Sequence, residues 1–272
     1  MKKHLSTIAL VMVLLVGLSL MLYPTVSDWW NSMHQSRAIA SYSETVAELD
    51  HTRYDELLAG ARAYNAALQN GPGRFMLTDE ERSTYEDVLD VSGTGIMGYI
   101  EIPAIGCSLP IYHGTSEGVL QIAIGHIEGS SLPVGGLGTH CVLSGHRGLP
   151  SAKLFTSLDK LVEGDTFMLH VLDETLTYEV DQILVVEPED VGALELDPLA
   201  DLCTLVTCTP YGINSHRLLV RGHRIETVLE KAPVAVTADA VRVERWKVAL
   251  AVAGPLLAAF ILMAFLLPRR RG

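Results

Sequence analysis

The chain has 272 residues, 49% of them hydrophobic, and a formal net charge of −12, which is enough apolar material for one sizeable domain with its own core. All 32 acidic residues lie between Asp28 and Glu244, whereas five of the 20 lysines and arginines lie in the two terminal tails. This acidic middle excludes nucleic acid as the expected partner, because phosphate binding needs clustered lysine and arginine.

The first predicted element is an uncharged apolar stretch from Leu5 to Tyr23, directly after Lys2 and Lys3. Its 19 residues, at about 1.5 Å each, nearly cross a hydrocarbon core of about 30 Å. A cleaved signal peptide is the alternative, but no small-x-small cleavage site follows the stretch. We therefore predict that residues 1–23 are a retained transmembrane anchor.

A helical lead-in is predicted for residues 24–95. Apolar residues recur at steps of three and four over residues 36–68, and a break near Asp50 divides this stretch into two helices. The Asn-Gly-Pro-Gly run at 70–73 ends the helical pattern. Thr78, followed by three acidic residues, predicts the N-cap of a further short helix.

From Gly95 onward, short β-like runs alternate with Gly, Pro, Asp and Ser turns. Examples of these predicted strands are residues 97–102, 138–144, 166–172, 177–186, 202–208 and 217–225. No amphipathic helix repeats between these runs, which argues against a parallel βαβ fold. Regular short strands favour a mainly β domain, closed into a barrel or packed as a sandwich, over residues 96–228.

The C-terminal part reads as a linker over residues 229–245 and a second transmembrane helix over residues 246–268. Residues 269–272 form a basic tail. Because basic residues stand at the outer end of each apolar stretch, the positive-inside rule predicts that both termini are cytoplasmic. The whole middle of the chain is then expected on the far side of the membrane.

Cys208 and Arg217 are the first pair of residues that could take part in catalysis. Cys208 ends the 202–208 run, Pro210 interrupts the chain, and Arg217 begins the next run. If the two runs form a hairpin, thiol and guanidinium become neighbours at its mouth. A nearby cation favours the nucleophilic thiolate, and arginine can stabilise an oxyanion with its forked donors.

His146 is the third candidate, in the glycine-flanked sequence Ser144-Gly145-His146-Arg147-Gly148 at the end of an earlier run. A cysteine with a distant histidine is the general pair of thiol catalysis. On the residues alone, a cysteine at the end of a strand is more often a small buried apolar side chain, and a lone histidine is more often structural.

A family resemblance adds to this reading. Thr204-Leu205-Val206-Thr207-Cys208, with Arg217 nine residues on, resembles the sortase signature, and residues 144–148 resemble the sortase histidine motif. Similarity extends densely over residues 96–226. The resemblance implies an eight-stranded sortase β-barrel and a cysteine transpeptidase with His146, Cys208 and Arg217 as catalytic residues. It further implies cleavage of an LPxTG-like sorting signal after its threonine and a thioester on Cys208.

Within sortases the chain most resembles class C, the pilus-assembly type. The C-terminal membrane helix, the long lead-in and Leu22-Tyr23-Pro24 ahead of the tryptophans carry this likeness. It implies surface-protein partners, namely pilin subunits, and transfer to a pilin lysine. Three alternatives remain: attachment of surface proteins to the peptidoglycan precursor, a hydrolytic cysteine protease, and a non-catalytic membrane-tethered binding domain.

One departure concerns the lid. Many class C sortases carry an Asp-Pro-aromatic lid motif, whereas this chain has Asn70-Gly71-Pro72-Gly73-Arg74-Phe75. Arg74 and Phe75 are therefore only candidate lid residues in a loop near 70–80, and a mobile loop without a lid function is the alternative.

The remaining cysteines and histidines receive no catalytic role. Cys107, Cys141 and Cys203 are predicted to be packing residues, and Cys203 faces away from Cys208 by strand alternation. The other histidines show no metal-ligand spacing, so neither metal nor other cofactor is expected. Arg221 and Arg224 are alternatives to Arg217.

Overall fold

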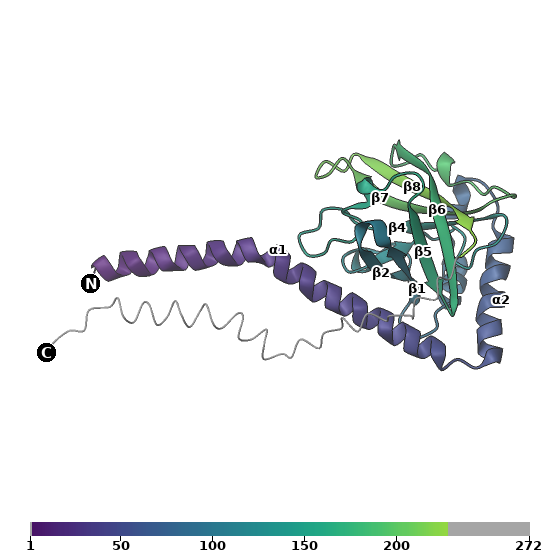
Figure 1. Cartoon of the computed structure of the whole chain (residues 1–272), viewed down its shortest axis with the longest axis horizontal. Coiled ribbons are helices and arrows are strands. Elements are labelled where there is room, and N and C mark those ends of the chain that lie inside the picture. Colours follow the sequence, from purple (N-terminus) through teal and green to yellow (C-terminus); the bar gives the residue numbers. More distant parts are fainter. Residues whose placement is uncertain (1, 228–272) are drawn as a thin grey trace. The chain divides into compact units, whose positions relative to one another are not determined.

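The computed structural model describes residues 2–227 (Figure 1). The α-helices in this part of the chain are α1 (Lys2–Ala47), α2 (His51–Ala67), α3 (Asp79–Asp87) and α4 (Glu117–Leu120). The strands are β1 (Ile96–Ile102), β2 (Cys107–His113), β3 (Ile124–His126), β4 (Thr139–Ser144), β5 (Thr166–Val171), β6 (Glu174–Val186), β7 (Asp201–Thr209) and β8 (His216–Ile225).

Helix α1 continues through Pro24, although the chain divides into two compact units between Tyr23 and Pro24. By length and composition, one helix in the described part of the chain can cross a membrane, and its most apolar window has a mean hydropathy of 2.1. A signal sequence meets the same criterion. The predicted linker, second membrane helix and basic tail lie outside the described residues.

The predicted break in the lead-in and the predicted N-cap are both confirmed. Asp50 caps α2 by accepting a hydrogen bond from the backbone N–H of Arg53 at 2.7 Å. Thr78 and Glu81 form a capping box at the start of α3, where the backbone N–H of Thr78 donates to the Glu81 carboxylate at 2.8 Å. These local bonds satisfy backbone donors that the first helical turn leaves without partners.

The strands close into a barrel in the order β1-β2-β3-β4-β7-β8-β6-β5. The predicted eight-stranded barrel is therefore confirmed. Neighbouring strands are antiparallel except for two parallel pairs, β2 with β3 and β4 with β7. The sequence runs did not include β2 or β3, because β2 contains Pro110 and β3 has only three residues, so neither shows a clear alternating pattern.

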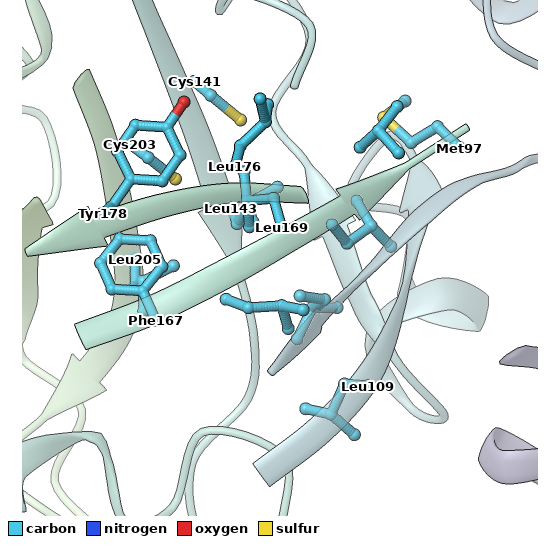
Figure 2. Packing of buried hydrophobic residues seen from close by; sticks show 14 of the residues in the cluster. Met97, Leu109, Cys141, Leu143, Phe167, Leu169, Leu176, Tyr178, Cys203 and Leu205 are labelled. Atoms are coloured by element: carbon cyan, nitrogen blue, oxygen red, sulfur yellow. The ribbon is translucent and has the colours of Figure 1, made fainter. Parts of the chain in front are cut away.

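Alternate residues of each strand fill the barrel interior. Phe167 and Tyr178 stack there with ring centroids 5.5 Å apart, and Figure 2 shows Cys141 and Cys203 beside Tyr178 in the same cluster. Gly222 leaves the room that these rings need, since a Cβ at this position would stand 2.8 Å from the Phe167 ring. The close packing makes the barrel a rigid support for its strand ends.

Buried polar side chains fasten the lead-in helices to the barrel. Tyr42 of α1 donates to the backbone oxygen of Met97 at 3.0 Å and accepts from the N–H of Leu172 at 2.8 Å. Asn65 of α2 bonds both backbone groups of Leu132. The helices from Pro24 onward therefore pack on the barrel as part of its folding unit.

Candidate active site

Cys208 and Arg217 face each other at one end of the β7–β8 pair. They are direct partners in the antiparallel register, and both side chains are half-buried. Cys203 and Leu205, on the opposite face of β7, belong to the buried interior cluster. The alternation of β7 therefore turns Cys208 away from the core, toward the outer face of the barrel.

The parallel pairing of β4 with β7 brings the third candidate to the same place. The backbone N–H of Gly145 donates to Val206 O at 3.0 Å, and Thr207 Oγ1 donates to Gly145 O at 2.8 Å. His146 directly follows Gly145, and Cys208 directly follows Thr207. The half-buried His146 thus lies at the end of β4, next to the end of β7 that carries the thiol.

Arg221 and Arg224, the two alternatives to Arg217, contact other side chains. Arg221 forms two hydrogen bonds with the Asp181 carboxylate, at 2.9 and 3.0 Å. The Arg224 guanidinium lies 5.8 Å from the centre of the Tyr178 ring. Arg217 Nη1 donates only to backbone oxygens of its own loop, the nearer being His216 O at 3.1 Å, and no carboxylate pairs with it among residues 2–227. Its charge is therefore available to a developing oxyanion beside Cys208.

The other three cysteines pack in or against the core, as predicted. Cys141 and Cys203 are register partners on β4 and β7, and both are buried. Burial raises the pKa of the Cys203 thiol well above its ordinary value and that of Cys107 to about 12. Cys107 and Cys203 are thus held in the protonated form, which is a poor nucleophile, and Cys141 is shielded from substrate by its burial.

The segment that contains Arg74 and Phe75 lies against the outer face that carries Cys208. Phe75 belongs to the short 3₁₀ helix Pro72–Phe75 and packs against a second apolar cluster, here called the outer cluster. The buried members of the outer cluster are Val142, Leu194, Val206 and Leu219. Two of them, Val206 and Leu219, stand two residues from Cys208 and Arg217 on their strands.

Polar contacts hold this segment to the loop between β6 and β7. Arg74 donates to Leu194 O, and its guanidinium lies 4.7 Å from the centre of the Phe75 ring. Asn70 bonds both backbone groups of Leu196, at 2.7 and 2.9 Å. On its other side the segment borders a cavity of about 680 Å³ that α2 and α3 also line. The segment is therefore docked over the outer cluster.

His140 of β4, for which the sequence predicts no catalytic role, is fully buried. Its Nδ1 lies 2.9 Å from Glu195 O and its Nε2 lies 2.7 Å from Thr204 Oγ1, so it joins the β6–β7 loop to β7. Burial lowers the pKa of His140 to about 4. Its partners lie 55 and 64 residues away in the sequence, so no local pattern signals this contact.

The chain is similar to a known protein family and to several known proteins. A family model described as the sortase domain matches residues 100–225. Sortase D of Bacillus subtilis (strain 168) is 30% identical over 178 residues, which cover 64% of this chain and 86% of that protein. Sortase A of Streptococcus agalactiae serotype III is 31% identical over 147 residues, 53% of this chain and 57% of that protein.

Solved structures give a higher identity. The crystal structure of sortase C1 from Streptococcus agalactiae is 50% identical, with a TM-score of 0.65, and the match covers 70% of this chain and 99% of that one. Sortase C of Streptococcus pneumoniae is 46% identical, with a TM-score of 0.62, over 70% of this chain and 97% of that one. The chain therefore belongs to the sortase family of cysteine transpeptidases, and its solved structural relatives include class C sortases.

Proposed function

We propose that this chain is a pilus-assembly sortase that joins pilin subunits through a thioacyl intermediate on Cys208. The observation that carries the chemical part is the register of β7 with β8 and with β4, which supports Cys208, Arg217 and His146 acting together. The class assignment is supported by 40–50% identity to class C sortases. The Streptococcus pneumoniae structure is described in terms of catalysis and pilin substrate specificity.

In the proposed acylation step, the Cys208 sulfur attacks the carbonyl carbon of threonine in an LPxTG-like signal. The carbonyl oxygen becomes an oxyanion, which the Arg217 guanidinium stabilises. As the threonine–glycine bond breaks, His146 donates a proton to the leaving glycine amine. The products are a thioester on Cys208 and a released peptide that begins with glycine.

In the proposed transfer step, a lysine amine of the next pilin attacks the thioester carbonyl. His146 takes a proton from this amine, the second oxyanion collapses, and Cys208 leaves as thiolate. The new bond is an isopeptide, and the enzyme returns to its starting state. Each group in such a scheme contributes about 10²–10⁴-fold to the rate.

We further propose that residues 70–76 are a lid over this site, with Phe75 as its apolar plug. The contacts of Phe75 with the outer cluster and of Arg74 with the β6–β7 loop support this role. Because the outer cluster includes Val206 and Leu219, on the same faces of β7 and β8 as Cys208 and Arg217, a sorting signal that extends along this face would meet Phe75. The Asp-Pro-aromatic motif is absent, so in this proposal Phe75 supplies the aromatic group and Arg74 anchors the segment through Leu194 O.

The localisation proposal is a membrane-anchored enzyme with both termini in the cytoplasm and the barrel outside. The apolar helix α1 supports the first anchor. Cysteine labelling from each side of the membrane, with single cysteines placed before residue 5 and after residue 268, tests this topology. Labelling of either position from the outside would contradict it.

The test of the reaction uses the full chain in detergent, an LPxTG-type peptide and a lysine-bearing pilin peptide. Mass spectrometry should show an acyl adduct on Cys208 that passes to the lysine amine. A parallel reaction with a peptidoglycan stem-peptide amine separates pilin polymerisation from cell-wall attachment. Free acid as the main product, with abundant amine present, would indicate a hydrolytic protease. Absence of any adduct, also after removal of Phe75, would contradict the transpeptidase proposal.

A further inference from the structure

Arg147, the residue after His146, is almost completely covered although it lies in a loop. Its side chain is 9% exposed, and its Nη2 donates to the carboxylate of Asp159 in the 3₁₀ helix Leu158–Lys160. Its Nη1 lies 3.4 Å from Thr209 Oγ1, and its guanidinium carbon lies 5.7 Å from the centre of the Tyr211 ring. One side chain therefore connects the His146 turn to two other segments, the 3₁₀ helix that carries Asp159 and the 209–211 stretch after Cys208.

The backbone next to Arg147 is shaped for these contacts. Gly148 has a φ of +76°, and a Cβ at this position would stand 2.9 Å from the Tyr211 ring. The N–H of Gly148 donates to Thr156 Oγ1 at 3.0 Å, and the N–H of Phe155 donates to His146 O at 3.1 Å. The turn that carries His146 is thus hydrogen-bonded to the 155–159 region, and it packs directly on the loop after Cys208.

These contacts bracket the two reacting side chains. Before the site, the Gly145 and Thr207 bonds join the end of β4 to β7. Beyond the site, the pairing of β4 with β7 has ended. There, the contacts of Arg147 with Thr209 and Tyr211 connect the segments that follow the two strands. His146 and Cys208 lie between these two cross-links. Their separation therefore depends on Arg147 as well as on the strand pairing.

We propose that Arg147 is a positioning residue, which with Asp159 and Tyr211 fixes the His146 turn at the distance from Cys208 that proton transfer requires. The proposal rests on the function proposed above. Arginine suits the task because its planar fork binds a carboxylate and a hydroxyl together while its face covers an aromatic ring. A displacement of about 1 Å between reacting groups lowers a rate by about 10²-fold.

The test compares Arg147→Met and Arg147→Lys with the wild-type full chain in detergent. An LPxTG-type peptide and a lysine-bearing peptide are the substrates, and rates are normalised to the amount of folded enzyme. For Arg147→Met we expect kcat to fall by about 10²-fold while KM changes by less than about threefold, because the lost contact acts on geometry between catalytic groups. Arg147→Lys should recover part of kcat, since lysine can reach Asp159 but cannot also cover Tyr211.

Arg53→Met is the matched control, because Arg53 forms an exposed ion pair with Glu56 on α2, away from the site. It should have the wild-type kcat. If Arg147→Met does not fold, Asp159→Asn and Tyr211→Leu take its place, with a smaller expected loss in kcat. If the wild type is slow because of the lid, all variants are compared in the Phe75→Ala chain.

Two outcomes separate this inference from the proposed function. If the wild type forms the thioester and the folded Arg147, Asp159 and Tyr211 variants keep its kcat, the positioning role is wrong and the transpeptidase stands. A loss of thermal stability with unchanged kcat also overturns it, because Arg147 then serves only the fold. If neither the wild type nor the Phe75→Ala chain forms a thioester, the proposed function itself fails.

Discussion

Cys203 and Cys208 lie on the same strand, five residues apart, in opposite environments. Cys203 is fully buried beside Cys141 and Tyr178, where burial raises its pKa and suppresses its chemistry (Figure 2). Cys208 is half-exposed on the other face, opposite Arg217. The difference teaches that strand parity, rather than residue type, decides which thiol of β7 is available for catalysis. The inner face provides rigidity, and the outer face carries the groups that can react.

The sharpest way to break this comparison is to remove each thiol in turn. Cys208→Ala should abolish the thioester and lower transfer by at least about 10⁴-fold with the fold intact, because no other thiol can take over the nucleophilic step. Cys203→Ala should keep the reaction and lower the free energy of unfolding by about 1–2 kcal/mol through the small cavity it leaves. Adduct mass spectrometry and urea unfolding measure both. An active Cys208→Ala chain would refute the assignment.

The arginines on the outer face of β8 offer a second matched pair. Arg217→Met should lower kcat by about 10²–10³-fold, because it removes the cation that we propose to stabilise the oxyanion beside Cys208. Arg221→Met, four residues along the same face, should leave kcat nearly unchanged, since its partner is Asp181. Steady-state kinetics on the LPxTG-type peptide distinguish the two. Equal losses would mean that the effect is general electrostatics rather than a specific contact.

A pH titration tests the buried part of the outer face through His140. Folding lowers the pKa of His140 to about 4 from an ordinary value of 6.5, so between these pH values the unfolded chain binds the proton and the folded chain does not. Stability is therefore fully present above about pH 6.5 and falls toward pH 4, by about 3 kcal/mol in total. Urea unfolding of wild type and His140→Gln across this range measures it. An identical pH dependence in both chains would assign the effect to other groups.

The smallest expected effect concerns Phe75, which packs against the outer cluster. Phe75→Ala should raise the rate of Cys208 acylation by about tenfold, because truncating a partly buried ring weakens the closed state of the lid by about 1–2 kcal/mol. Met76→Ala is the matched control, since this side chain is 83% exposed and should give no change. Stopped-flow acylation measures both variants. A slower reaction in Phe75→Ala would instead make Phe75 part of the substrate-binding surface.

Local patterns in the sequence were sufficient where the physics is local. Thr78 and the three acidic residues after it predicted the start of α3, and the alternation of residues 202–208 predicted that Cys203 and Cys208 face opposite ways. Both depend on neighbours within a few residues. The motifs around His146, Cys208 and Arg217 similarly predicted the sortase barrel, which the strand order confirms.

The sequence by itself thus determined the family, the strands with clear alternation and the candidate catalytic residues. Only the tertiary structure decided the parallel pairing of β4 with β7, the short strand β3, and the contacts of Asn70, His140 and Arg147. These contacts join segments that lie 55 to 126 residues apart, except for the Arg147–Asp159 pair. Long-range pairing leaves no periodic trace in the chain, because each partner's composition suits many neighbours and only the closed barrel selects one.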